Sequence, residues 1–462
     1  MRLAAVPASA AVPAHLRADA AGAAILLAAL AATYANSFAG GFQFDDFNVI
    51  VRESSVQSLR AWWRTQPSIR PLLKLSHAVN HAAGWGLAGF HAVNLAIHAV
   101  NTLLVWWLLR LLAPAVAVDA RAQRLAALAG AAVFALHPVQ TEAVTYVSGR
   151  STSLAGAFAL ASLTLWLHGR ERGDARLVHL ASPLALAAAL ACKEYAVVTP
   201  VAMLLCARLR GEAGAWRDVR VHALVVALLL AGACAVSRYR ALLEASLVAR
   251  EPAVQLLTQA RALSYLALQL VRLHALNADP ALAAAERLDA ATACQLLGWV
   301  ALPVGALQGW RRHPLLSFAL LWYMLWLAPT HSILPRLDVV NERQLYLALA
   351  GPAFAGVVLL LRHAPAFIAA VPVLLVLLAL ATWQRNAVYA DEVTFWADAA
   401  SKSPHNARAF ANLGHALALA CRGDEALQAL DIALALDPQQ HRAAINRGLL
   451  AAGEGQVGHC MR

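Results

Sequence analysis

Long, uninterrupted apolar stretches recur along most of this chain and limit its possible folds more than any other feature. Each is close to the roughly 20 residues that a helix needs to cross a hydrocarbon layer of about 30 Å. Hydrophobic residues make up 60% of the 462 positions and charged residues 14%, too few charges to cover a soluble surface. The stretches do not alternate, which excludes a β-barrel, and their hydrophobicity excludes disorder. The sequence therefore predicts an all-α, polytopic membrane helix bundle.

The candidate spans begin with the apolar stretch from Ala20 to Tyr34. The others cover about 90–109, 125–137, 153–168, 177–191, 195–208, 221–237, 290–308, 315–330, 344–361 and 366–383. The segment 259–276 is excluded, because Arg261 and Arg272 each cost up to roughly 2.5–3.5 kcal/mol at mid-membrane, which outweighs its leucines. We expect that segment to be an amphipathic helix at the interface. About eleven spans result.

Arginines gather in the short loops on one side of these spans. They are Arg110, Arg121, Arg124, Arg170, Arg172, Arg176, Arg208, Arg210, Arg217, Arg220, Arg311, Arg312 and Arg362. The positive-inside rule then predicts a cytoplasmic N-terminus and an outward-facing C-terminal tail. Topology also accounts for the net charge of +11, so no nucleic-acid partner is expected. The basic start from Arg2 to Arg17 leaves a cleaved signal peptide and a first span as alternatives.

The tail from about Asp391 is more polar and contains no further span. It has the small and large residues of a tetratricopeptide repeat, at Phe410, Leu413, Gly414, Leu417, Ala426, Leu430, Ala433 and Pro438. One repeat cannot bury its own face, so we expect either a truncated array or a tail that docks on the membrane domain. Four regions follow: the N-terminus and first helix (1–36), the first outer loop (37–89), the multi-span domain (90–385) and the tail (391–462).

The six cysteines show no zinc-site spacing and are interpreted as packing residues, although Cys421 and Cys460 can pair if the tail faces an oxidising space. The abundance of Ala, Leu and Arg over Lys is typical of a GC-rich bacterial genome, and so indicates a plasma (inner) membrane location. No metal or other cofactor is indicated, though a divalent metal is compatible with the sequence.

An acidic pair, Asp45 and Asp46, lies among aromatic residues in the first outer loop. Apolar surroundings and a neighbouring charge can raise the pKa of such a carboxylate and make it a general base. Adjacent residues do not share a helix face, so we expect one to be the base and the other to orient it, bind a metal or cap a helix. A solvated turn or a simple helix N-cap is the structural alternative.

Further polar residues gather on the predicted outer side. The segment from His137 to Ser151 contains Gln140, Glu142 and Arg150, and each of its polar groups needs a partner near the membrane. Other outer turns contribute Arg70, Lys193, Arg240, Glu342, Arg343 and Tyr346. Converging arginines suit a lipid phosphate, which they bind in bidentate fashion. These polar residues also have purely structural explanations: helix caps in the connecting loops, an ion pair between Lys193 and Glu194, and ordinary contacts with lipid headgroups.

Taken together, these motifs resemble the transmembrane and tetratricopeptide-repeat-containing O-mannosyltransferases and their bacterial relatives. The motifs occur in the family's order and are FDDFNVIV, RPLLKLS, FHAVNLAIHAVN, HPVQTEAVTYVSGRS, CKEY, LNADP, NERQLYL and SPHNARAFANLG. The resemblance spans about residues 36–440 and implies a GT-C glycosyltransferase fold. Such an enzyme takes a sugar from a lipid phosphate on the outer face and passes it to an acceptor hydroxyl of a protein Ser or Thr, or of another glycan or lipid.

The resemblance also implies roles for individual residues. Asp45 and Asp46 match the family's acidic pair, which supplies the carboxylate that takes the acceptor's proton during in-line displacement at the anomeric carbon. Polyprenyl phosphate leaves and gains from nearby cations. The expected phosphate ligands are Arg150, Arg240, Arg343, Arg70 and Lys193, and the expected supporting residues are His137, Gln140, Glu142, Glu342 and Tyr346. The repeat departs from the family in two ways. It lacks the Gly that the family has two positions before Gly423, and little more than one repeat precedes the segment GEGQVGHCMR.

Two functions of other classes remain as alternatives. A transporter or flippase for lipid-linked sugars would use the same charges along a substrate path, although such charges are expected near the membrane midplane rather than at one face. A non-catalytic scaffold that displays a peptide-binding repeat would tolerate Asp45→Asn and Asp46→Asn, whereas the enzyme would not.

Overall fold

The computed structural model describes residues 14–117, 119–332, 334–336 and 338–452, and within these ranges the backbone forms helices and loops without a strand. The α-helices are α1 (Ala14–Tyr34), α2 (Leu59–Arg64), α3 (Pro71–Ala83), α4 (Gly86–Leu112), α5 (Ala120–Leu136), α6 (Thr141–Val144), α7 (Arg150–Arg172), α8 (Ser182–Leu190), α9 (Thr199–Leu209), α10 (Ala215–Ala235), α11 (Ser237–Val248), α12 (Pro252–Gln269), α13 (Ala290–Gly309), α14 (Pro314–Leu327), α15 (Leu345–Ala348), α16 (Ala350–His363), α17 (Val371–Ala387), α18 (Glu392–Lys402), α19 (Ala407–Leu419), α20 (Gly423–Leu436) and α21 (His441–Ala451). Short 3₁₀ or π segments are η1 (Ala35–Ala39), η2 (Phe47–Val51), η3 (Ser54–Val56), η4 (Ala113–Ala115), η5 (Pro138–Gln140), η6 (Val147–Gly149), η7 (Leu177–Ala181), η8 (Glu194–Val198), η9 (Leu273–Ala275), η10 (Glu342–Gln344) and η11 (Pro365–Ala370). The predicted all-α class is confirmed.

Five described helices are long and apolar enough to cross a membrane, and up to seven spans result if two bent helix pairs each count as one. The five lie at Ala18–Ala39, Gly86–Ala115, Ala215–Ala235, Ala290–Gly309 and Ile368–Ala387. Leucines on these helices face outward, with Leu228 of α10 62% exposed and Leu297 of α13 69% exposed, as expected of lipid-facing positions. The chain is therefore a multi-pass membrane protein. The other expected spans fall on the bent pairs and on α7, α8, α9 and α14.

The two bent pairs contain two of the sequence motifs noted above. Each is bent by 53°, one between Ala120–Leu136 and Pro138–Val144, the other between Glu342–Ala348 and Ala350–His363. Pro138 explains the first bend, because proline excludes helical backbone at the preceding residue, and His137 is extended there. Pro352 accounts for the second, since its ring cannot donate to the Ala348 carbonyl one turn earlier. The residues at both bends are mostly buried, including His137, Gln140 and Tyr346.

The centre of the bundle is a single apolar cluster to which α4, α5, α7, α14 and α16 contribute. Small residues let these helices approach closely. Gly351 of α16 lies so near Trp322 of α14 that an added Cβ would stand 2.7 Å from the indole ring. This dense packing leaves the cavities of interest at the loop end of the bundle.

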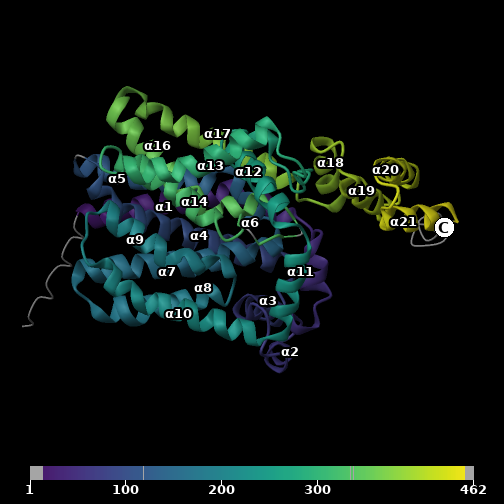
Figure 1. Cartoon of the computed structure of the whole chain (residues 1–462), viewed down its shortest axis with the longest axis horizontal. Coiled ribbons are helices and arrows are strands. Elements are labelled where there is room, and N and C mark those ends of the chain that lie inside the picture. The colour runs from purple at the N-terminus through teal and green to yellow at the C-terminus, as the bar shows by residue number, and fades with distance from the viewer. Residues whose placement is uncertain (1–13, 118, 333, 337, 453–462) are drawn as a thin grey trace, which may run out of the picture.

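Helix α12 contains the first part of the segment 259–276, which was expected not to span, and its position at the membrane interface stays a prediction. It is absent from the candidate spans, and Arg261 pairs with Asp289 at 2.6 Å. Figure 1 places α2, α3, α11 and α12 near the end of the bundle from which the tail projects. Of these helices, α3 and α11 contribute residues to the lining of the candidate site.

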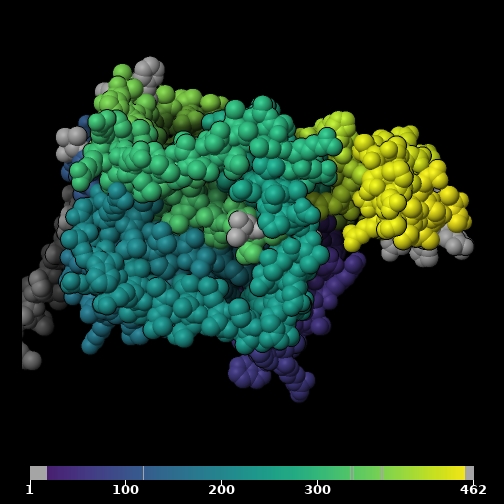
Figure 2. All heavy atoms as spheres, viewed as in Figure 1, coloured from purple at the N-terminus to yellow at the C-terminus, as the bar shows by residue number. Residues whose placement is uncertain are grey.

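Helices α18–α21 form the tail, which protrudes from one end of the bundle in Figures 1 and 2. Helix α19 packs along α20, and Gly414 permits the contact because an added Cβ would lie 2.6 Å from Leu430. The tail also docks on the membrane domain, where Asn406 donates to the Asp279 carbonyl at 3.0 Å and Lys402 to the Leu276 carbonyl at 2.8 Å. Of the two expectations for the tail, docking is thus observed. The basic start before residue 14, the end from residue 453 and Cys460 lie outside the described residues.

Candidate active site

Asp46 is fully buried and holds the first outer loop in place. Its carboxylate accepts hydrogen bonds from the Gln43 backbone at 2.9 Å and from the Ser148 backbone at 2.7 Å, and the Ser148 hydroxyl donates to it as well. Burial raises its pKa to about 7, although these hydrogen bonds oppose the shift. Asp46 therefore joins the loop to the segment after His137, and it lines neither of the two cavities described below.

Asp45, by contrast, faces open space. Its backbone N–H donates to the Tyr146 hydroxyl at 3.0 Å, and its side chain lines two separate cavities. Burial raises the pKa of this carboxyl, and the positive charge of Arg343 partly offsets the rise. The preceding residue, Phe44, has a φ of 40°, a left-handed backbone conformation that is unusual outside glycine. The two adjacent carboxylates thus have different surroundings and different capabilities.

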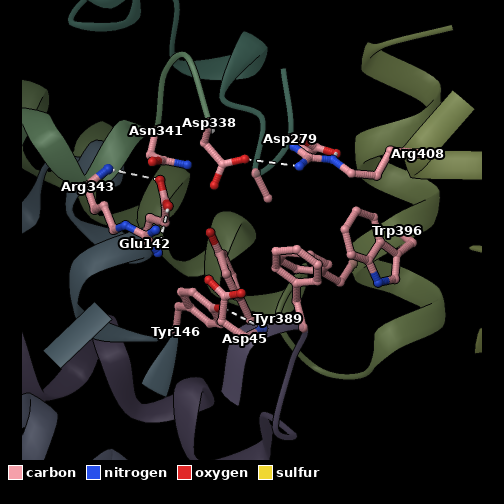
Figure 3. Close-up of a pocket in the computed structure, with 13 residues that line it drawn as sticks. Asp45, Glu142, Tyr146, Asp279, Asp338, Asn341, Arg343, Tyr389, Trp396 and Arg408 are labelled. Carbon is pink, nitrogen blue, oxygen red and sulfur yellow. Dashed lines mark hydrogen bonds and ion pairs between the residues drawn. The ribbon is translucent and has the colours of Figure 1, made fainter. Parts of the chain in front are cut away.

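The first cavity, here called the tail-side cavity, lies between the loop, the two bent motifs and the tail. It has room for about one water molecule, about 20 Å³, and is drawn in Figure 3. Its lining consists of Phe44, Asp45, Glu142, Tyr146, Ala278, Asp279, Asp338, Asn341, Arg343, Tyr389, Phe395, Trp396 and Arg408. Arg408 of α19 pairs with Asp338 at 3.0 Å and with Asp279, so the tail supplies part of the wall. Aromatic faces and paired charges therefore surround a narrow space with room for a small polar group such as a hydroxyl.

The second cavity, here called the basic cavity, opens on the other side of Asp45. It encloses about 1170 Å³, including open solvent. Its charged lining comprises Arg70, Lys74, Lys193, Arg238, Arg336 and Arg343, opposed by Asp45, Glu53 and Glu194. Leu73 and Leu242 supply apolar surface next to these charges. The combination suits an anionic headgroup attached to a hydrocarbon chain.

Several cations of the basic cavity lack a carboxylate partner. Arg70 pairs with Glu194 at 2.7 Å, but Arg336 and Arg238 form no ion pair with any described residue. Burial, together with Arg343 and Arg70, lowers the pKa of Arg336 to about 10. Burial and the same positive neighbours hold the pKa of Lys193 well below its usual range. A bound anion would relieve this repulsion.

Asp45 and Arg343 stand in the wall that the two cavities share. Arg343 is held by Glu142, which accepts from the Arg343 backbone at 2.9 Å and lies 3.5 Å from its guanidinium. The guanidinium also lies over the Tyr146 ring, 5.8 Å from its centroid. A carboxylate and a fixed cation therefore separate an anion-binding space from a second, aromatic space.

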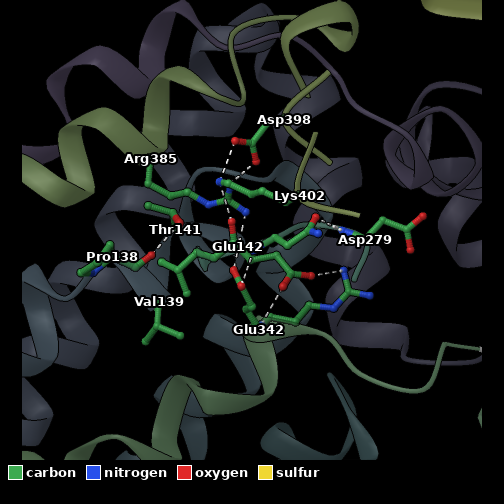
Figure 4. Close-up of polar contacts among 12 residues, drawn as sticks. Pro138, Val139, Thr141, Glu142, Asp279, Glu342, Arg385, Asp398 and Lys402 are labelled. Atoms are coloured by element: carbon green, nitrogen blue, oxygen red, sulfur yellow. Dashed lines mark hydrogen bonds and ion pairs between the residues drawn. The ribbon is translucent and has the colours of Figure 1, made fainter. Parts of the chain in front are cut away.

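A buried charge network ties this wall to the tail (Figure 4). Glu342 accepts from the Asn277 backbone at 2.5 Å and lies 3.6 Å from Arg385, which pairs with Asp398 of α18 at 2.7 Å. Lys402 binds the same aspartate at 2.6 Å. Because Glu342 is the residue before Arg343, the docking of α18 helps to set where Arg343 stands.

We expect Arg385→Met to destabilise the protein by about 3–5 kcal/mol, because it leaves Glu342 buried and without its cation. The thermal midpoint in detergent should fall, and a protease should cut more readily between α17 and α18. The control is Arg422→Met, which removes an exposed ion pair with Glu425 and should change neither result. An unchanged midpoint for Arg385→Met would mean that the network does not hold the tail.

The remaining predicted residues, His137, Gln140 and Tyr346, form hydrogen bonds outside the two cavities. The His137 ring accepts from the Val139 backbone at 3.2 Å and contacts the Leu270 carbonyl at 3.1 Å. Gln140 donates to the Phe134 and Tyr346 carbonyls at 3.1 and 3.3 Å. The Tyr346 hydroxyl meets Asn101 at 2.9 Å and His98 at 2.8 Å. None of the three lines either cavity, so they position the bent segments.

Two of the expected phosphate ligands, Arg150 and Arg240, line neither cavity. Arg150 is fully buried and donates to Asn94 at 2.6 Å and to the Phe90 carbonyl at 3.0 Å, so its guanidinium joins α7 to α4. Arg240 is exposed and donates to the Cys234 carbonyl at 3.3 Å, outside the basic cavity. Arg238, two residues earlier on α11, occupies the lining instead.

Sequence reasoning also missed residues that come to the site from segments without a strong motif. Arg336 is an isolated arginine in the loop between α14 and η10, and no motif surrounds it. Trp396 and Arg408 lie in the tail, where a repeat pattern drew attention to packing rather than to surface. Among the described residues, no group of three or more His, Cys, Asp or Glu side chains is arranged to hold a metal ion.

Comparison with known proteins gives a consistent set of relatives. No protein-family model matches the chain, and no solved structure does. The chain is 34% identical over 220 residues to protein O-mannosyl-transferase Tmtc2 of Drosophila melanogaster, covering 42% of the chain and 22% of that protein. It is 36% identical over 192 residues to Tmtc1 of the same organism, covering 37% and 21%.

A mammalian relative gives the same result. Protein O-mannosyl-transferase TMTC4 of Mus musculus is 30% identical over 193 residues, covering 36% of the chain and 26% of that protein. The chain thus matches about a fifth to a quarter of the length of these relatives. Over about two fifths of its own length, it is distantly homologous to protein O-mannosyl-transferases.

Proposed function

We propose that this protein is a glycosyltransferase that moves a hexose, mannose or a similar sugar, from polyprenyl phosphate to an acceptor hydroxyl at the outer face of a membrane. The observation that carries the proposal is the place of Asp45 and Arg343 in the wall between the two cavities. The distant homology to protein O-mannosyl-transferases supports the same chemistry.

In this proposal the basic cavity binds the donor. The phosphate lies against Arg343, Arg336 and Lys193, and the prenyl chain leaves along Leu73 and Leu242 toward the lipid. Arginines can grip the phosphate in bidentate fashion. Arg336 forms no ion pair with a described residue, and its Nη1 donates to the neutral side-chain oxygen of Gln344 at 2.7 Å, so its charge is not neutralised by a carboxylate. The sugar then extends toward Asp45.

The acceptor hydroxyl enters from the tail-side cavity. Asp45 takes its proton while the acceptor oxygen bonds to the anomeric carbon and the bond from that carbon to the phosphate oxygen breaks. Polyprenyl phosphate leaves with the electron pair, and Arg343 and Arg336 stabilise the charge that develops on it. Single displacement inverts the anomeric centre. Asp46 and Glu142 are positioning residues, the former for the loop and the latter for Arg343.

The proposed function also implies a fold type, a number of membrane spans and a topology. The bundle is of the GT-C type with about eleven spans, which requires α7, α8, α9 and α14 to cross along with the five long helices and the bent pairs. The N-terminus is cytoplasmic and the tail, a short tetratricopeptide-repeat unit, faces outward from a bacterial plasma membrane. In this architecture region 1–36 anchors the protein, region 37–89 carries the catalytic carboxylate, region 90–385 binds the donor, and region 391–462 is the tail.

The test is donor turnover by the purified protein with a panel of polyprenyl-phosphate-linked hexoses, offered with Ser/Thr peptides or with glycans. Release of polyprenyl phosphate that depends on the acceptor supports the proposal. Labelled donor that crosses vesicle membranes without release would instead indicate a lipid flippase. Absence of both, with the protein folded, would favour a scaffold.

The pH dependence of turnover offers a sharper test of Asp45. A general base must be ionised, so kcat/KM should rise with pH through the raised pKa of Asp45. Arg343 lowers that pKa, and Arg343→Met should therefore move the acidic limb of the profile to higher pH. Arg240→Met, outside the cavity, should leave the limb where it is. If the acidic limb stays at the same pH in Arg343→Met, the group that titrates there is not Asp45.

A further inference from the structure

An apolar groove lies on the outside of the bundle between α9, α13 and α14, and is here called the α9 groove. It has room for about 440 Å³, within the range of about 300–1,000 Å³ that is typical of small-molecule sites. Leu204 of α9, Leu307 of α13 and Leu321 of α14 line it, and every other described lining residue except Arg208 is also apolar. Leu204 is 36% exposed and Leu307 50% exposed, so the groove is open along the surface of the bundle.

The α9 groove is separate from the candidate active site. Helix α9 begins five residues after Glu194, which lines the basic cavity, and in Figure 1 it lies in the part of the bundle away from the tail. No residue that lines the groove also lines the basic cavity or the tail-side cavity. A ligand of the groove is therefore neither the proposed sugar donor nor the proposed acceptor.

Arg208, in the last turn of α9, is the charged residue in the lining of the groove. It is exposed, and it forms neither an ion pair nor a hydrogen bond with any described residue. Its guanidinium lies over the Trp310 ring, 4.5 Å from the centroid. This cation–π contact orients the plane of the guanidinium and leaves its N–H donors without acceptors. Such a group matches a phosphate in bidentate geometry.

The chain around Arg208 is also positively charged. Arg311 and Arg312 follow the tryptophan directly, are exposed, and form no ion pair with any described residue. Glu212, the acidic residue that follows α9 in the next loop, is already paired with Arg170 at 2.9 Å. Three guanidiniums at this end of α9 and α13 thus lack a carboxylate partner, and charge complementarity favours an anion beside them.

The apolar groove and the basic end together match an amphipathic ligand. Tryptophan and arginine are typical of the membrane interface, and basic pockets between membrane helices bind anionic headgroups. From Arg208 to Val201, α9 rises about 10 Å, which is less than one leaflet's half of a hydrocarbon layer of about 30 Å. A single phospholipid in one leaflet therefore spans the groove. A lipid without net charge would fill the groove but leave the cations unpaired.

We propose that the α9 groove binds a phospholipid with an anionic headgroup. One acyl chain lies along Leu204 and Leu321, and the phosphate contacts Arg208 above Trp310. Because the lipid contacts α9, α13 and α14 together in the folded state, it stabilises this part of the bundle by mass action. The site does not depend on the proposed sugar transfer, so either proposal can fail without the other.

The experiment is native mass spectrometry of the full-length protein, purified in detergent and stripped of lipid. The probes are dioleoyl phosphatidylglycerol, which is anionic, and dioleoyl phosphatidylcholine, which has the same acyl chains but no net charge. The test variants are Arg208→Met, which removes the cation, and Leu204→Trp, which fills the groove. Their controls lie on α10, outside the groove. Arg217→Met removes an exposed arginine that also lies over an indole ring, at 5.6 Å, and Leu228→Trp enlarges an exposed leucine.

We expect the wild type to bind phosphatidylglycerol at least tenfold more tightly than phosphatidylcholine, and its thermal midpoint to rise more with the anionic lipid. Arg208→Met should weaken binding of phosphatidylglycerol about five- to tenfold and so remove most of this preference. Leu204→Trp should weaken binding of both lipids, because the acyl chain loses its place. Both controls should bind as the wild type does.

Equal binding of the two lipids by the wild type would overturn the proposal. Equal losses in Arg208→Met and Arg217→Met would also overturn it, since general surface charge would then attract the lipid. Unchanged binding in Leu204→Trp would place the lipid outside the groove, and a protein dimer that this variant abolishes would assign the groove to a second copy of the chain.

Thermal midpoints measured without added lipid check that each variant is folded. If Leu204→Trp is unstable, Val201→Trp fills the same groove from a position that is 52% exposed, and the same loss of both lipids is expected. Unchanged lipid binding in that variant would contradict the proposal equally. Arg208→Lys keeps the charge but not the bidentate geometry, and it should recover part of the preference for phosphatidylglycerol.

Discussion

Asp45→Asn is expected to lower sugar transfer by about 10²–10⁴-fold while leaving the protein folded and able to bind donor. Asparagine fills the same space but cannot accept a proton from the acceptor hydroxyl. The Asp45 backbone N–H, which donates to Tyr146, is untouched by the change, so the loop keeps its contact with the segment after His137. The measurement is kcat for release of polyprenyl phosphate at saturating acceptor, beside the thermal midpoint.

Asp46→Asn is the matched comparison, since it changes the neighbouring carboxylate in the same way. Its carboxylate accepts from the Gln43 and Ser148 backbones, and an amide NH₂ at either oxygen would face a donor. We expect a loss of stability of about 1–3 kcal/mol and a smaller loss of kcat. If Asp46→Asn loses transfer at an unchanged thermal midpoint while Asp45→Asn stays active, then Asp46 is the base and Asp45 the positioning residue.

The second large effect is expected from Arg336→Ala, which should lower kcat/KM for the donor by about 10²–10³-fold. Arg336 forms no ion pair with a described residue, so its removal leaves no orphaned carboxylate, unlike removal of Arg70 from Glu194. The loss therefore reports on the donor phosphate rather than on folding. Arg336→Lys should recover part of it, since lysine keeps the charge but not the bidentate geometry.

Arg240→Ala serves as the control for Arg336→Ala, because Arg240 is an exposed arginine of α11 that lines neither cavity. It should alter kcat/KM little. Equal losses in both variants would mean that general surface charge attracts the donor, and the basic cavity would lose its assigned role. Salt dependence separates the cases further, since an exposed charge is screened more than a partly buried one.

The membrane character and helical class follow directly from apolar runs of span length, which is why they could be predicted without coordinates. The bend at Pro138 was also accessible, because proline restricts the preceding residue whatever the tertiary structure. The bend near Ala348 depends on Pro352 inside an apolar run, where hydropathy alone shows a continuous span. Short helices such as α8 and α14 likewise leave the number of crossings open to length and composition.

The sequence motifs indicated which residues to consider for the candidate site, but not which way each side chain points. Asp45 and Asp46 are equivalent in sequence, and only the positions of Ser148 and Tyr146 distinguish them. Arg238 and Arg240 are two residues apart on α11, hence about 200° apart around a helix, so one faces the cavity and the other does not. The helix phase relative to a cavity is a tertiary property that local pattern does not contain.

Arg150 illustrates the same limit. A conspicuous arginine at the start of a span suggested a phosphate ligand, yet Asn94 and the Phe90 carbonyl of α4 satisfy its guanidinium inside the bundle. Arg336, which has no motif around it, lines the basic cavity because a loop brings it there. Long-range packing decides which charges are partnered and which remain available.

Whether Asp45 and Arg343 separate the donor from the acceptor can be tested directly with a structure of the protein bound to a polyprenyl phosphonate analogue of the sugar donor, which cannot transfer its sugar. We expect the phosphonate to lie against Arg336 and Arg343 in the basic cavity, with the anomeric carbon directed at the space between Asp45 and the tail-side cavity. A phosphonate bound at the opposite end of the bundle, or a sugar turned away from Asp45, would contradict it.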